Sequence, residues 1–118
     1  MDAQFVNETA KYIMTVIKAS QAIFYSWGTH SVKAVVYKEM AALQFTVSGF
    51  LHKGDVIVAY NGGADLFEVY LLKKGEVIKS KKGIYVDELV RVIDASVEKN
   101  TSDEEYKKIV HGEYCILE

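Results

Sequence analysis

Residues 55–72 read D-V-I-V-A-Y-N-G-G-A-D-L-F-E-V-Y-L-L, and this stretch decides the fold. Two runs of β-branched, aromatic and other apolar residues, 55–60 and 66–72, stand on either side of the small, polar residues 61–65. An Asn-Gly pair between two such runs is a strong hairpin signal, because both residues tolerate positive φ. The spacing predicts a turn longer than the two-residue kind, in which Asp65 bonds local backbone amides.

The Gly-Gly pair also raises the question of a ligand loop, because glycine lets a backbone approach a bound group closely. A phosphate-binding loop places its glycines before a helix N-terminus, as in G-x-x-x-x-G-K-[ST] or G-x-G-x-x-G. Strand-forming residues follow Gly63 instead. The pattern therefore favours a turn over a phosphate-binding loop.

Alternation of apolar and polar residues continues toward the N-terminus. Residues 43–48 put Leu, Phe and Val on one face and Gln, Thr and Ser on the other, which is typical of a half-solvated antiparallel strand. Residues 32–37 also alternate, and residues 74–79 predict a fifth, shorter strand. The links between the strands are short, and short links join antiparallel neighbours. We therefore expect an antiparallel meander of four to five strands.

Helical spacing flanks the strands on both sides. Apolar residues recur at three- and four-residue steps over residues 2–24 and again over 85–97. Residues 102–105 read S-D-E-E, a capping-box pattern that predicts a second C-terminal helix ending near His111. The order predicts a single α+β domain over residues 1–118, with an N-terminal helix, the meander, two C-terminal helices and two-layer helix-on-sheet packing. Trp27, at the break after the first helix, is expected to close the core.

Composition limits the function classes. The chain has 118 residues and a net charge of −2, which suits one domain and disfavours a globally basic nucleic-acid binder. Cys115 is the one cysteine, so no intramolecular disulfide forms, which fits a reducing cytoplasm. The acidic N-terminus lacks a secretory signal, and no apolar run approaches the ~20 residues of a membrane helix. We expect a cytoplasmic protein that does not bind membranes.

The sequence predicts no catalytic residue, metal ligand or cofactor. Three histidines lie far apart in the chain: His30, His52 and His111. His52 shares a loop with Asp55, but zinc sites use tighter sets of ligands, so solvated loop histidines are expected. Cys115 has acidic neighbours and apolar ones, which indicate an inert thiol. The paired carboxylates stand at predicted helix starts, where capping and the helix dipole explain them.

A lysine cluster follows the fourth predicted strand: Lys73, Lys74, Lys79, Lys81 and Lys82. Residues 73–82 carry a net charge of +4, and the rest of the chain carries −6. Such a basic hairpin on an acidic body suits a salt-sensitive contact with phosphate or an acidic partner. Lysines also protect edge strands and aid solubility, which is the alternative explanation. No arginine lies in this segment for bidentate recognition of bases, which disfavours nucleic acid as the partner.

Short motifs resemble a group of small uncharacterised proteins carried by bacterial phages and mobile elements. The matching residues are V-I-V at 56–58, N-G at 61–62, D-L-F-E-V at 65–69 and I-Y-V-D-E-L at 84–89. Those proteins read in outline as a strand, N-G-x-D-L-Y, a further strand, and V-Y-C-D-Q-L opening a helix.

The resemblance spans about residues 43–93 and has departures. This chain has one more residue between the Gly and the Asp, and it carries Phe67, Val86 and Glu88 where the group has Tyr, Cys and Gln. Because Val86 stands where the group has Cys, thiol chemistry is not available at this position. The resemblance implies a compact α+β accessory protein of bacterial or phage origin, without a named activity.

Three hypotheses for the function follow. The first is a non-enzymatic binding or accessory protein that acts through protein–protein contacts as a homodimer, because the chain is rich in apolar and aromatic residues and has open strand edges. The second is a small-ligand-binding domain or enzyme with a pocket between sheet and helices, formed by His52, Tyr60, Asp65 and Tyr70. The third is a structural or assembly subunit that forms oligomers larger than a dimer.

Overall fold

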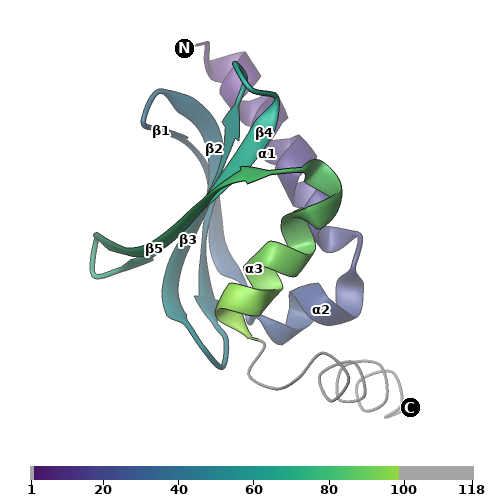
Figure 1. The fold of residues 1–118 in the computed structure, drawn as a ribbon, viewed down its shortest axis with the longest axis vertical. Helices are drawn as coiled ribbons and strands as arrows, with labels where there is room; N and C mark the ends of the chain where they lie inside the picture. Colours follow the sequence, from purple (N-terminus) through teal and green to yellow (C-terminus); the bar gives the residue numbers. More distant parts are fainter. Residues whose placement is uncertain (1, 99–118) are drawn as a thin grey trace.

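The computed structural model describes residues 2–98 (Figure 1). Its elements in chain order are α1 (Ala3–Lys18), α2 (Gln21–Ser26), β1 (His30–Tyr37), β2 (Met40–Ser48), β3 (Lys53–Asn61), β4 (Leu66–Lys73), β5 (Glu76–Ile84), a 3-10 turn η1 (Val86–Glu88) and α3 (Leu89–Val97). The second C-terminal helix predicted from residue 102, and with it His111 and Cys115, lie outside the described residues. No helix within residues 2–98 is long and apolar enough to cross a membrane.

The five strands form one sheet in the order β1-β2-β3-β4-β5, with every neighbouring pair antiparallel. This confirms the predicted α+β fold with an antiparallel meander. The fifth strand is not short, because β5 has nine residues, as do β2 and β3. Figure 1 shows a strongly twisted sheet with α1, α2 and α3 on one of its sides. The first and last strands, β1 and β5, are the two open edges.

The main core lies between the sheet and the helices. Helix α1 supplies residues at three- and four-residue steps, and alternate residues of β2, β3 and β4 meet them. Several of these side chains are fully buried: Ile13, Ile17, Phe45, Val56 and Val58. Helix α3 adds an apolar stripe of Leu89, Ile93 and Val97, which have no exposed surface. The sequence periodicity therefore identifies the residues that hold the two layers together.

The N-terminal helical segment is broken, contrary to the single helix predicted over residues 2–24. Helix α1 ends at Lys18, and Ser20, with φ −101° and ψ 73°, leads into the short helix α2. The break turns the chain so that Phe24 and Trp27 reach the same core as α1. Both helices keep an apolar face toward that core, which is why the periodicity continues through the break.

Trp27 closes the core, as predicted. Its side chain has no exposed surface, and its ring stacks against Phe45 with 6.4 Å between the ring centroids. Its indole Nε1 donates a 2.9 Å hydrogen bond to Oδ1 of Asp94 on α3. The aromatic cluster at the end of α2 is therefore part of the packed interior.

The opposite face of the sheet carries a smaller cluster, which none of the described helices covers (Figure 1). Its buried members are Ala42, Ile57, Ala59, Tyr70 and Leu72. Partly buried side chains from β1 and β2 pack around them: Val35, Tyr37 and Met40. Ala42 and Ala59 at the centre are paired across β2 and β3. Because both side chains are small, the larger side chains on the adjacent strands cover them and shield them from water.

Candidate ligand-binding grooves

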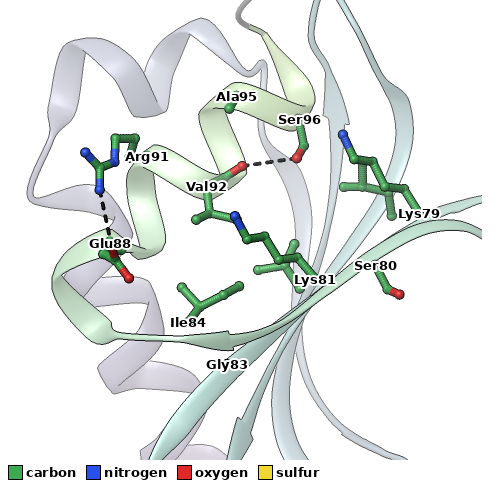
Figure 2. A pocket seen from close by; sticks show the side chains of 12 residues that line it. Lys79, Ser80, Lys81, Gly83, Ile84, Glu88, Arg91, Val92, Ala95 and Ser96 are labelled. Atoms are coloured by element: carbon green, nitrogen blue, oxygen red, sulfur yellow. Dashed lines mark hydrogen bonds and ion pairs between the residues drawn. The ribbon is translucent and has the colours of Figure 1, made fainter.

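A groove runs between β5 and α3 on the helix side of the sheet, and we call it the lysine groove (Figure 2). Its cavity volume is about 480 Å³. Val69 and Leu71 of β4 line it together with Lys79 and Lys81 of β5. From the helix side it is lined by Glu88, Arg91, Val92, Ala95 and Ser96.

The groove exists because β5 packs against the helices only at its last residue. Ile84 is buried, whereas residues 76–83 of β5 are all exposed. Helix α3 turns its larger apolar side chains toward the main core and leaves the small Ala95 and Ser96 along the groove. The space between strand and helix therefore stays open, with apolar side chains of β4 beneath it.

The ladder between β4 and β5 sets the direction of the two groove lysines. Lys79 pairs with Leu71 and Lys81 pairs with Val69, and both partners belong to the helix-facing core. Cross-strand partners point to the same face of a sheet, so both lysines share that face. Figure 2 shows their side chains reaching into the groove toward α3, while Ser80 between them points away.

The charges of the groove are unbalanced. The ion pair within residues 2–98 joins Arg91 to Glu88 at 3.4 Å, along α3 and η1, and Figure 2 shows it on the far side of α3 from the lysines. Neither Lys79 nor Lys81 has a carboxylate partner among these residues. The groove therefore offers two free ammonium groups over an apolar floor, which suits an anionic group attached to an apolar one.

The other predicted lysines lie outside the groove. Lys73 ends β4, and Lys74 sits in the tight turn before β5 with φ 53°, followed by Gly75 with φ 82°. Lys82 is exposed on β5 and does not line the groove. The structure thus divides the five lysines into a groove pair, a turn pair and the separate Lys82. It also adds α3 as the facing wall, which the sequence did not indicate.

A second groove lies where the N-terminal half of α1 passes the β3–β4 turn and the segment after β5, and we call it the aromatic groove. Its cavity volume is about 950 Å³. Aromatic rings line it: Phe5, Tyr12, Tyr60, Phe67 and Tyr85. Three carboxylates line it as well: Glu8, Asp65 and Asp87. Its described lining contains no lysine, arginine or histidine.

The β3–β4 turn brings Tyr60 and Asp65 together. The Tyr60 hydroxyl donates a 2.7 Å hydrogen bond to Oδ1 of Asp65, which has a left-handed φ of 56°. This hydrogen bond raises the pKa of Tyr60, with desolvation and the Asp65 charge adding to it. The turn's backbone is bonded by Asn61, whose Oδ1 accepts from the Ala64 amide at 3.2 Å. The residue that accepts a backbone amide in this turn is therefore Asn61, and not Asp65 as predicted. Asp65 lines the groove instead.

The other two predicted pocket residues lie elsewhere. His52 is 5% exposed, so the expectation of a solvated histidine is wrong. Its amide donates to the Val97 carbonyl at 3.1 Å, and its ring Nε2 lies 3.2 Å from the Asp55 carbonyl. The end of α3 thus holds the backbone of His52, while its ring lies against the start of β3. No group of three or more His, Cys, Asp or Glu side chains within residues 2–98 is placed to hold a metal ion.

Tyr70 belongs to a polar cluster on the opposite face of the sheet. Its hydroxyl donates to Oε1 of Glu68, and Asn61 Nδ2 donates to Oε2 of the same carboxylate at 3.2 Å. Lys38 Nζ lies 4.8 Å from the Tyr70 ring centroid. Burial raises the pKa of Tyr70 to about 12, with the Glu68 hydrogen bond and charge and the Tyr37 hydroxyl contributing. Glu68 was not anticipated, because its place in an alternating strand gives no sign of its burial.

Comparisons of the chain with protein-family models, curated proteins and solved structures found no match. The resemblance to phage proteins, the homodimer and the cytoplasmic location therefore stay predictions.

Proposed function

We propose that this chain is a non-enzymatic binding protein whose lysine groove takes an acidic, partly apolar segment of a partner protein. The observation that supports this is the pair Lys79 and Lys81, which point into a groove with an apolar floor and have no carboxylate partner within residues 2–98. Two cations above Val69 and Leu71 match a segment in which acidic and apolar side chains alternate or adjoin.

The side chains that line the groove favour a protein segment over a nucleic acid. The apolar floor does not help to bind a phosphate backbone. Apolar side chains of a protein segment, in contrast, stabilise the complex by about 25 cal/mol for each Å² of apolar surface removed from water. The groove's arginine is already paired with Glu88 and is turned away from the lysines. Protein–protein contact is therefore the better account of these residues.

The groove does not favour catalysis. Its two hydroxyl groups belong to Ser80, which points away, and Ser96, whose Oγ donates to the Val92 carbonyl at 3.1 Å. A serine nucleophile needs a base within hydrogen-bond reach, and no histidine of residues 2–98 lines the groove. Binding is accordingly the activity that these residues support.

The test uses a fluorescein-labelled peptide D-E-L-E-D-L-E and fluorescence anisotropy. The double variant Lys79→Gln/Lys81→Gln should bind about tenfold more weakly than the native chain, since two partly screened charge contacts are lost. The matched control is Lys73→Gln/Lys74→Gln, which removes the same charge at the turn, outside the groove. Raising salt from about 50 to about 200 mM should weaken native binding. Equal losses in both double variants would mean diffuse attraction and would reject the groove.

A further inference from the structure

We propose that the aromatic groove is a second binding site, which takes a basic segment of a protein partner by seating a Lys or Arg side chain against its aromatic rings. The groove lies apart from the lysine groove and has the opposite charge.

The aromatic lining is exposed to an unusual degree. Phe5 is 46% exposed, Tyr12 53% and Tyr85 62%, and all three line one groove. Large exposed apolar side chains that gather in one place mark interaction surfaces more often than scattered ones do. Aromatic faces also attract cations through the negative charge above the ring, and arginine is the most frequent partner.

The charged lining selects a cationic occupant. Glu8 comes from α1, Asp65 from the β3–β4 turn and Asp87 from η1, so three separate elements each bring one carboxylate to the groove. No ion pair within residues 2–98 involves any of them. Charge complementarity therefore excludes an acidic segment and favours a guanidinium or ammonium group.

The groove is also held in shape before any ligand arrives. Tyr60 is fixed by its 2.7 Å bond to Asp65, and its ring lies 5.4 Å from that of the buried Phe67. The Tyr85 carbonyl accepts a 2.9 Å bond from the Glu88 amide, which fixes the start of η1. Binding to a preformed groove loses less conformational entropy than binding to a mobile one.

One short segment separates the two grooves. Ile84 and Glu88 line the lysine groove, while Tyr85, Val86 and Asp87 between them line the aromatic groove. A partner with a basic stretch is thus seated next to the place where an acidic stretch binds. The aromatic site does not depend on the lysine groove, since no lysine of the described part of the chain lines it.

The test measures the fluorescence anisotropy of a fluorescein-labelled peptide R-G-R-G-R-G with the full chain at low salt. The native chain should bind this peptide, and the matched peptide E-G-E-G-E-G should not compete for the site. Tyr85→Leu and Tyr12→Leu keep apolar bulk but remove the ring, so each should weaken binding about threefold. Asp87→Asn should weaken it by a similar factor. Both tyrosines are exposed, so these variants should fold.

The controls separate the groove from general attraction to an acidic protein. Glu39→Gln removes the same charge as Asp87→Asn, but from the exposed β1–β2 turn, and should leave peptide affinity unchanged. Equal effects of the two variants, or unchanged binding in Tyr85→Leu, would overturn the proposal. Self-association that Asp87→Asn abolishes, without peptide binding, would assign the groove to a second copy of the chain and overturn it as well.

Discussion

Trp27 and Asp94 are joined by a 2.9 Å hydrogen bond between side chains that are both almost completely buried. The bond spans 67 residues of sequence and ties the end of α2 to α3. A buried carboxylate is stable only when donors satisfy it, so the indole has a structural role beyond filling space. It also holds α3 in the position that forms one wall of the lysine groove.

Replacing Trp27 with Phe should lower the free energy of unfolding by about 1–3 kcal/mol, because the buried carboxyl group of Asp94 loses the hydrogen bond from the indole. The smaller ring adds a packing loss. Asp94→Asn retains an acceptor oxygen for the indole, so it should lower the free energy of unfolding less than Trp27→Phe does. Urea unfolding followed by circular dichroism measures both variants. A Trp27→Phe variant as stable as the native chain would show that the bond has no role in stability.

Gly49 should not tolerate a side chain. A Cβ there would lie 2.5 Å from both Cγ1 and the carbonyl oxygen of Val97, at the end of α3. Gly49→Ala should therefore destabilise the chain by about 1–3 kcal/mol, as overpacking does. The matched control is Gly62→Ala in the β3–β4 turn, where the nearest atom is 3.6 Å away, and it should change stability by less than about 0.5 kcal/mol. Similar unfolding midpoints for the two variants would contradict the close packing of the β2–β3 loop on α3.

Tyr70 should make stability fall at high pH. Its pKa is raised from 10.0 to about 12 in the folded chain, chiefly by burial. Between these two values the native state keeps a proton that the unfolded chain has lost, so the free energy of unfolding decreases as pH rises through this window. Below it, the contribution is fully present.

The measurement is urea unfolding of the native chain and of Tyr70→Phe at several pH values from about 9 to about 12. The difference in stability between the two should shrink with rising pH, because the variant has no proton to lose at this position. The exposed Tyr25→Phe serves as the control and should follow the native curve. Parallel curves for Tyr70→Phe and the native chain would contradict the burial of this hydroxyl beside Glu68.

Asp65 should accept only residues that adopt a left-handed backbone. Its φ of 56° is tolerated by Asp and Asn but is strained for β-branched residues. Asp65→Val should lower the free energy of unfolding by about 1–3 kcal/mol, whereas Asp65→Asn should lower it clearly less. Thermal unfolding by calorimetry compares the two. Equal stability would mean that the turn relaxes into another conformation.

The meander was predictable because β2 alternates strictly, while β3 and β4 are runs of strand-forming residues on either side of a turn. In β2, and across the β3–β4 hairpin, the residues on one face of the sheet are apolar. The links between these strands are short, and short links indicate antiparallel pairing. The length of β5 was missed because its exposed lysines and serine carry no apolar alternation. The break at Ser20 was missed because both helices keep the same apolar periodicity toward one core.

The grooves were only partly predictable. The lysine cluster was visible as charge, but the placement of Lys79 and Lys81 in the groove, apart from the other three lysines, depends on the β4–β5 register. Tyr60 and Asp65 were identified as pocket residues and do meet, since they lie five positions apart in one hairpin. Their companions on α1 and after β5 come from distant parts of the chain, and tertiary packing alone places them. The burial of His52 was not predicted for the same reason, since its loop is held by a backbone hydrogen bond to Val97 at the end of α3.

The most direct test of binding in the lysine groove is amide chemical-shift mapping of ¹⁵N-labelled native chain titrated with the peptide D-E-L-E-D-L-E. We predict that the largest shifts occur at Lys79 and Lys81 on β5 and at Val92 and Ser96 on α3, the two walls of the groove. Shifts confined to the turn at Lys74 and Gly75, with α3 unaffected, would contradict the account.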